Sequence, residues 1–307
     1  MVGAQGILER IEEIMKKEMK KKIVVTGGAG FVGSHLIEAL VKNPQFEVYS
    51  LDNYFTGKKE NHIVGATYIE GSTKDISSLI SFRADLVFHL GEYSRVEQSF
   101  SDLPIVWEYN KDGTFAVLEY CRKHASKIVY AGSSTKFGDG GAGRDQSPYA
   151  WTKATNTELV RNYGEWFGLE YAITYFYNVF GPREISSGKY ATLIGLFKEK
   201  TKSGEKLTVR EPGTQKRIFT YVTDIVDGLL LVGEKGTGDN YGLGAKEAFT
   251  ILEIAQMFGG EIEMIEGRPG NRMVASIDTS RSTGELGWEP KVSVKDHIRE
   301  FLSSLSS

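Results

Sequence analysis

Residues 26–33 read TGGAGFVG, directly after the apolar run KKIVV and directly before SHLIEALVKN. The first run predicts a buried strand and the second a helix, so the glycines occupy the turn between them. Gly27, Gly30 and Gly33 have a G-x-x-G-x-x-G spacing, slightly different from the dinucleotide fingerprint G-x-G-x-x-G. Glycine allows a tight turn, a close approach of the backbone to a pyrophosphate, and close packing of helix on sheet. The stretch therefore predicts a nucleotide cofactor at the positive end of a helix.

On both sides of this turn, short apolar runs alternate with helical segments. The predicted strands are KIVVTG, EVYSLDN, ATYIEG, ADLVFHLG, SKIVYAGSS and YAITYFYN. The alternation predicts an α/β fold with a Rossmann-type, doubly wound parallel sheet. From about residue 179 the regularity loosens, which predicts a smaller C-terminal α/β substrate-binding lobe. We expect an amphipathic helical extension at 1–21, a cofactor-binding domain at 22–178, and at 179–307 mainly the lobe, with some segments returning to the first domain.

Composition excludes several classes of protein. The chain has 307 residues, of which 40% are hydrophobic and 25% charged, with a net charge of −3, as in ordinary globular proteins. Near-neutral charge gives no reason to expect nucleic acid or a membrane surface as a partner. The single cysteine, Cys121, cannot form an internal disulfide, and no run approaches the roughly 18 apolar residues of a membrane span. We expect a soluble, cytoplasmic protein, and the five dispersed histidines indicate no metal site.

The second predicted strand ends at Asp52, nineteen residues after Gly33. An acidic side chain at this place can accept a hydrogen bond from a ribose 2′-hydroxyl and repel a 2′-phosphate. The sequence therefore favours NAD over NADP as the cofactor. Lys58 and Lys59 lie nearby and keep NADP open as an alternative.

Tyr-x-x-x-Lys occurs twice, as YFTGK at 54–58 and as YAWTK at 149–153. A spacing of four brings two side chains together only on a helix. The first copy lies in a glycine-containing loop, whereas the second follows Ser147 and Pro148, a favourable N-cap and first-turn pair. Lys153 would then favour the phenolate form of Tyr149 by its positive charge, so that this tyrosine could act as an acid or base.

Two serines, Ser133 and Ser134, end the fifth predicted strand. Open α/β sheets bind ligands at this edge, so a hydroxyl there can hold a reacting oxygen. The alternative for each serine is a purely structural role in the turn.

Taken together, TGGAGFVGSHL, LDN, FHLGE, the serine pair, YAWTK and YNVFGPR resemble the extended short-chain dehydrogenase/reductase family between about residues 22 and 290. The likeness is strongest to its NAD-dependent nucleotide-sugar epimerases and dehydratases, in particular those like UDP-glucose 4-epimerase. It implies a tightly held NAD that is reduced and reoxidised within one turnover. It also implies catalytic roles for Ser133, Tyr149 and Lys153, with Lys153 holding the nicotinamide ribose as well.

The resemblance extends the predicted site to further positions. The predicted cofactor-binding residues are Gly27, Gly30, Phe31, Val32, Gly33, Asp52, Asn53, Ser72, Leu90, Asn110 and Lys153. The predicted substrate-binding residues are Ser134, Asn178, Arg217, Arg268 and Ala275. The two arginines fall where the family binds the substrate's diphosphate, which suits the geometry of a guanidinium.

Several positions depart from the family pattern. Dehydratases carry Asp and Glu after the catalytic residue, where this chain has Ser134 and Thr135, so dehydration is disfavoured and decarboxylation more weakly so. Ser72 replaces a common Asp near the adenine. The segment HLGEYSRVEQS is unusual, and its Glu92, Tyr93 and Arg95 would lie near the nicotinamide and sugar. If the segment after Arg268 aligns with the family without gaps, Ala275 occupies the position whose size decides whether a 2-acetamido group fits. A small residue there suggests that N-acetylhexosamines are admitted.

The leading hypothesis is a nucleotide-sugar 4-epimerase acting on a UDP-hexose or UDP-N-acetylhexosamine through a 4-keto intermediate. Alternatives are an epimerase at another carbon, a reductase or a decarboxylase of the same family, and, in another class, a non-catalytic NAD-binding regulatory protein. Family members pair through two long helices, so the resemblance implies a homodimer through residues 104–124 and 149–167.

Overall fold

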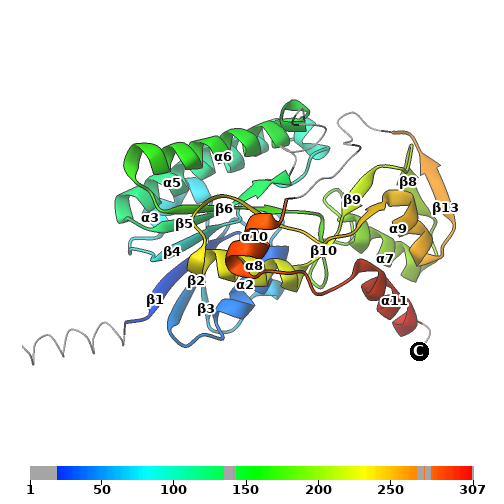
Figure 1. Cartoon of the computed structure of the whole chain (residues 1–307), viewed down its shortest axis with the longest axis horizontal. Helices are drawn as coiled ribbons and strands as arrows, with labels where there is room; N and C mark the ends of the chain where they lie inside the picture. Colours follow the sequence, from blue (N-terminus) through cyan, green and yellow to red (C-terminus); the bar gives the residue numbers. More distant parts are fainter. Residues whose placement is uncertain (1–18, 135–140, 142, 268–272, 274–277, 306–307) are drawn as a thin grey trace, which may run out of the picture.

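The computed structural model describes residues 19–134, 141, 143–267, 273 and 278–305. Its centre is a seven-stranded parallel sheet with the strand order β11-β6-β5-β4-β1-β2-β3 (Figure 1). The strands are β1 (Lys21–Thr26), β2 (Phe46–Asp52), β3 (Ala66–Glu70), β4 (Leu86–His89), β5 (Lys127–Ser133), β6 (Tyr171–Phe176) and β11 (Gly238–Leu243). This is the Rossmann-type sheet that the alternating pattern predicts, and its strand order reverses between β1 and β4.

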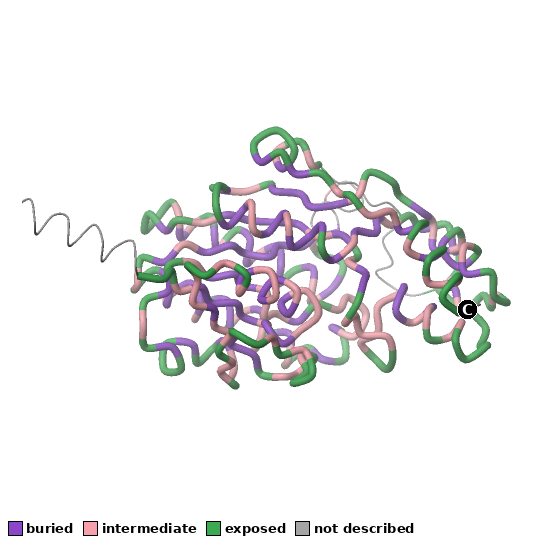
Figure 2. The backbone as a smooth tube through the Cα atoms, turned by 90° about the horizontal axis from the view of Figure 1, so that it is seen from below, coloured by how far each residue is buried: buried purple, intermediate pink, exposed green. Residues whose placement is uncertain are grey.

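Helices cover both faces of the sheet. One face carries α3 (Ile76–Leu79), α5 (Gly113–His124) and α6 (Pro148–Phe167), and the other carries α2 (Phe31–Leu40), α8 (Val222–Lys235) and α10 (Ser280–Leu286). Each layer encloses its own apolar core, one including Val117 and Val160 and the other including Ile37 and Leu229. In Figure 2 the buried residues accordingly follow the strands and the inner sides of these helices.

Register brings the polar strand ends to one edge of the sheet. Thr26 at the end of β1 is paired with Leu51 in β2 and with His89 in β4, and His89 is paired with Tyr130 in β5. Since all these strands are parallel, the loops that follow them meet at a common carboxyl edge. The predicted cofactor and catalytic residues follow or end these same strands.

The helix with the second Tyr-x-x-x-Lys begins as the sequence predicts. Ser147 is extended and its hydroxyl accepts a hydrogen bond from the backbone N–H of Ala150 at 3.1 Å, while Pro148 occupies the first helical position of α6. The helix ends at Gly168, whose φ of 66° closes it in the left-handed conformation. Tyr54 of the first copy also has a positive φ, 56°, and lies outside any helix, so only the second copy is helical.

The long connection from β4 to β5 contains a helical irregularity. It starts with α4 (Leu103–Val106), continues as the π-helical turn η4 (Trp107–Asp112) and passes into α5. A short 3₁₀ turn, η3 (Gln98–Phe100), precedes α4 in the same connection, and two more, η1 (Lys59–Asn61) and η2 (Thr73–Asp75), occupy other loops. A π-turn inserts an extra residue into a helix and often lies at a functional site.

A small lobe stands beside the carboxyl edge of the sheet, at the right of Figure 1. It contains α7 (Leu193–Ser203), α9 (Ile251–Phe258), α11 (Val294–Leu305), and the strand pairs β8 (Leu207–Arg210) with β13 (Ile262–Ile265), β9 (Lys216–Ile218) with β12 (Ala248–Thr250), and β7 (Val179–Phe180) with β10 (Thr220–Tyr221). Phe197, Val209 and Phe258 belong to its separate apolar core. Between these pieces the chain returns to the large sheet through α8, β11 and α10.

Most of the predicted N-terminal extension, residues 1–18, lies outside the described residues, and β1 begins at Lys21. Within the described ranges, no helix combines the length and apolarity needed to cross a bilayer. Cys121 is buried in the core.

Candidate active site

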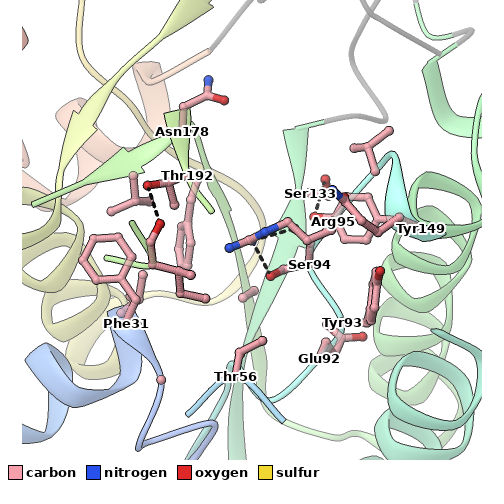
Figure 3. Close-up of a pocket in the computed structure, with 18 of the residues that line it drawn as sticks. Phe31, Thr56, Glu92, Tyr93, Ser94, Arg95, Ser133, Tyr149, Asn178 and Thr192 are labelled. Atoms are coloured by element: carbon pink, nitrogen blue, oxygen red, sulfur yellow. Dashed lines mark hydrogen bonds between the residues drawn. The ribbon is translucent and has the colours of Figure 1, made fainter. Parts of the chain in front are cut away.

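A pocket of about 720 Å³ lies between the carboxyl edge of the large sheet and the small lobe. It is lined by the glycine turn, by the ends of β2, β4 and β5, by the start of α6, and by residues of the small lobe. Figure 3 shows Ser133 and Tyr149 on one side of it and Phe31 and Thr192 on the other. Ser133 and Tyr149 belong to the end of β5 and the start of α6, whereas the opposite side combines Phe31 at the start of α2 with Thr192 of the small lobe.

The glycine turn forms a cradle that has no room for side chains. Gly27 has a φ of 73°, and a Cβ there would lie 2.9 Å from Cα of Gly91. A Cβ on Gly33 would collide with the carbonyl oxygen of Gly27, so the start of α2 packs directly on the turn. No side chain caps α2, whose N-cap is Gly30, and the first amides of a helix lack partners within the helix. These features fit the pyrophosphate of a dinucleotide.

Asp52 fixes the loops around the cradle. Its Oδ2 accepts a hydrogen bond from the backbone N–H of Ala29 at 2.9 Å, and its Oδ1 accepts one from Tyr54 at 2.8 Å. Burial raises the pKa of Asp52, and these backbone hydrogen bonds oppose the rise. The carboxylate lines the pocket at the position predicted for recognition of a ribose hydroxyl.

The tyrosine and the serine of the predicted catalytic set are brought together. The phenolic O–H of Tyr149 donates to Oγ of Ser133 at 3.2 Å (Figure 3). Ser133 comes from the end of β5 and Tyr149 from the first turn of α6, so the contact depends on how α6 packs on β5. Lys153 lies one turn further along α6 and also lines the pocket.

The ammonium group of Lys153 is bound to the carboxylate of Glu92 and to the carbonyl oxygen of Ala131. Side-chain exposure is only 6% for Lys153 and 3% for Glu92, so this is a buried ion pair. Burial alone would raise the pKa of Glu92, but the charge of Lys153 and several hydrogen bonds outweigh it and hold that pKa below its ordinary value. The unusual Glu92 is therefore the direct partner of the predicted catalytic lysine.

A polar network surrounds this pair. Oε1 of Glu92 accepts hydrogen bonds from Thr114 at 2.8 Å, Asn156 at 2.9 Å and Tyr130 at 3.2 Å. The ring of His89 is within hydrogen-bond distance of Thr26 and Thr114 on its two nitrogens, and burial lowers its pKa to about 4. His89 is thus a neutral, hydrogen-bonded interior residue.

Two predicted cofactor residues stand outside the pocket wall. Asn110, in the π-turn η4, is fully buried, and its amide bonds to both backbone groups of Tyr93 and to Thr152. The hydroxyl of Ser72 accepts from the backbone N–H of Lys74 and caps η2. The other described cofactor candidates line the pocket: Gly27, Gly30, Phe31, Val32, Gly33, Asp52, Asn53, Leu90 and Lys153.

Some of the predicted substrate-binding residues line the pocket, and others lie outside the described part of the chain. Ser134, Asn178 and Arg217 line the pocket. Asn178 donates to the carbonyl oxygen of Ile218 at 2.8 Å, which ties the start of β7 to β9 within the small lobe. Arg268 and Ala275 lie outside the described residues, so their roles stay predictions.

Sequence reasoning identified Glu92 and Arg95 as unusual and expected them near the nicotinamide and sugar, and both line the pocket. It did not find the pairing of Glu92 with Lys153, nor the contributions of Thr114 and Asn156 to the network. One signal was present: a carboxylate at the end of a buried strand needs a charged or hydrogen-bonding partner. Which partner it takes depends on the packing of α5 and α6.

A glycine cradle facing a tyrosine–serine pair at the switch point of a parallel sheet defines an enzyme site of the Rossmann class that binds a dinucleotide. The sequence model of the NAD dependent epimerase/dehydratase family matches residues 23–244. The chain belongs to this family, and its cofactor is NAD.

Similar proteins catalyse more than one reaction on UDP-sugars. The chain is 31% identical to UDP-glucuronic acid decarboxylase 3 of Arabidopsis thaliana, over 90% of this chain and 86% of the relative. It is 30% identical to a putative UDP-glucose 4-epimerase of Methanocaldococcus jannaschii, over 92% of this chain and 97% of the relative. The solved structure of UDP-glucuronic acid 4-epimerase from Bacillus cereus, in complex with UDP-glucuronic acid and NAD, has a TM-score of 0.83 and 26% identity, covering 92% of this chain and 99% of that one. The chain is therefore an enzyme of the group that modifies nucleotide sugars.

Proposed function

We propose that this protein is a nucleotide-sugar 4-epimerase whose substrate is a UDP-linked sugar. The observation that carries the proposal is the Tyr149–Ser133 hydrogen bond on the pocket wall that faces the small lobe. It is supported by Ser134 and Thr135, which offer no carboxyl group where dehydratases have acidic residues. A hexose or an N-acetylhexosamine would both suit this chemistry.

In this proposal Tyr149 removes the proton from the C4 hydroxyl, and Ser133 holds the same oxygen by a hydrogen bond. The glycine cradle and Asp52 would hold NAD, which would supply the hydride-transfer chemistry needed at C4. The positive charge of Lys153 stabilises the phenolate of Tyr149. Arg217 holds the diphosphate, so that the sugar can turn within the pocket between the two half-reactions.

A decarboxylase of a UDP-uronic acid is the second candidate. It is supported by the likeness to the Arabidopsis enzyme, which covers 90% of this chain. The absence of a carboxylic acid at position 135 argues against it.

The test is to incubate the purified protein, without added NAD, with UDP-glucose, UDP-N-acetylglucosamine or UDP-glucuronic acid and to follow the sugar protons by NMR. We expect the C4 epimer of at least one substrate, with no loss of carbon. A pentose formed from UDP-glucuronic acid would establish the decarboxylase instead. If none of the three sugars changes even after NAD is supplied, the proposal fails.

We further propose that the protein is a homodimer paired through α5 and α6. These helices and the adjoining η4 expose Trp107, Phe115, Trp166 and Phe167 at 47–60% of their surface. Large aromatic side chains exposed together are typical of association surfaces.

Light scattering after gel filtration should therefore give about twice the chain mass of 34.1 kDa. Phe115→Glu should shift the protein towards the monomer, because a charge would be buried in the interface. The same change at Val64, a loop residue that is 97% exposed, is the control and should leave the mass unaltered. A wild-type monomer at micromolar concentration would contradict the proposal.

A further inference from the structure

Arg95 brings a guanidinium into the pocket beside the tyrosine–serine pair. It lies in the loop after β4, and Figure 3 shows its side chain next to Ser133 and Tyr149, pointing across the pocket towards the small lobe. Its Nε and Nη2 donate to the carbonyl oxygen of Tyr190 at 2.9 and 2.7 Å. Its Nη1 donates to the carbonyl oxygen and the hydroxyl of Ser94 at 3.1 and 3.0 Å. These contacts use four of the five N–H groups of the guanidinium, and the fifth, on Nη2, has no partner among the residues that the structure describes.

The positive charge of Arg95 is not neutralised within the described part of the chain. All the partners just named are neutral oxygens. The carboxylates that line the pocket are engaged elsewhere: Asp52 with the glycine turn, Glu92 with Lys153, and Glu97 with Arg210 at 3.7 Å. Burial lowers the pKa of Arg95, which reflects the cost of keeping this charge away from water. An anionic ligand would remove that cost.

The position of Arg95 restricts which anion that can be. If C4 of the sugar lies at Tyr149, the diphosphate on C1 is attached at the opposite side of the pyranose ring. The substituent on C5 is then the nearest group to C4 that can carry a negative charge. In a hexuronic acid this substituent, C6, is a carboxylate, and one of its oxygens can accept a charge-assisted hydrogen bond from Nη2 of Arg95.

We propose that Arg95 binds the C6 carboxylate of a UDP-linked hexuronic acid and makes the site selective for uronates over neutral hexoses. This inference rests on the proposed chemistry at C4, because that chemistry places the ring against Tyr149. Arg95 then acts as a specificity-determining residue, and its hydrogen bonds to Tyr190 hold the segment before α7 in place for the same contact.

The experiment compares UDP-glucuronic acid with UDP-glucose on the NAD-loaded, full-length protein. Calorimetry gives the two dissociation constants, and NMR gives kcat/KM where turnover occurs. We expect the wild type to prefer the uronate, and Arg95→Gln to lower this preference by about 10- to 100-fold, as for loss of a hydrogen bond to a charged group. Glutamine can still donate to the Tyr190 carbonyl but has no charge.

Two further variants separate charge recognition from other roles. Arg95→Lys keeps the charge and should retain a preference for the uronate, whereas a purely structural role would make the lysine and glutamine variants behave alike. Arg217→Gln removes a pocket cation that is predicted to bind the diphosphate. It should raise the dissociation constants of both UDP-sugars by a similar factor. Melting curves report whether each variant is folded.

The outcomes distinguish this inference from the proposed function. Equal affinity of the wild type for the two sugars, or an undiminished preference in Arg95→Gln, overturns the role of Arg95 even if UDP-glucose is epimerised. If the uronate binds in a manner that depends on Arg95 but is not inverted at C4, the role of Arg95 in uronate recognition is supported and the proposed epimerase function is refuted.

Discussion

Tyr149→Phe is expected to lower kcat by about 10²- to 10⁴-fold, the range that a positioned general acid or base contributes. The phenolic O–H donates to Ser133 and lies on the pocket wall, where the sugar hydroxyl would be held. Phenylalanine keeps the ring and removes only the group that can carry the proton. The measurement is steady-state turnover of whichever UDP-sugar the wild type epimerises.

Bound NAD, measured after denaturation of the purified variant, should remain near the wild-type level, because the cradle lies at the other strand ends. Tyr163→Phe is the matched control on the same helix. Tyr163 lies near the C-terminal end of α6, where its hydroxyl donates to Glu119 at 2.8 Å, and it does not line the pocket, so this change should leave kcat near that of the wild type. Unchanged turnover in Tyr149→Phe would refute its assigned role.

Glu92→Gln is expected to destabilise the protein by about 3–5 kcal/mol, the usual effect of removing one partner of a buried ion pair. Glutamine preserves the size and part of the hydrogen bonding, but it leaves the ammonium of Lys153 in the interior without its counter-charge. Turnover should fall as well, since the position of Lys153 depends on this partner. Chemical denaturation gives the free energy of unfolding.

A double-mutant cycle identifies the cause of the loss. Lys153→Met also breaks the pair, and if the penalty comes from an unpaired buried charge, the combined Glu92→Gln and Lys153→Met variant will be more stable than the sum of the single effects predicts. Glu108→Gln is the control, because it breaks a partly exposed ion pair with Lys74. It should lower the free energy of unfolding much less than Glu92→Gln does. Additive losses in the cycle would show that Glu92 and Lys153 are not coupled.

These predictions involve residues that the sequence identified to different extents. Tyr149 was recognised because Ser147 and Pro148 mark the start of a helix, and the structure confirms that start. Its partner Ser133 was placed correctly at a strand end, but the 3.2 Å contact between them required the packing of α6 on β5. Glu92 and Arg95 were recognised as departures from a pattern and expected near the nicotinamide and sugar, but their partners could not be predicted, since these are far away in the sequence.

Local sequence determined the elements of this protein and most of its cofactor cradle. Apolar runs of strand length separated by helical periodicity specify the parallel sheet, and glycines without Cβ atoms are required where Gly27 and Gly33 pack on neighbouring backbone. These features depend on residues within a few positions of one another, or on a period that can be read along the chain.

Only the tertiary structure decided which charges in the pocket are neutralised. Glu92 meets Lys153 across 61 positions of sequence, and Arg95 meets the Tyr190 carbonyl across 95. Both contacts depend on the packing of a helix or lobe against the sheet edge. Whether a buried charge is paired or left for a ligand follows from that three-dimensional arrangement, because electrostatic interactions in the interior depend on distance and burial rather than on order in the chain.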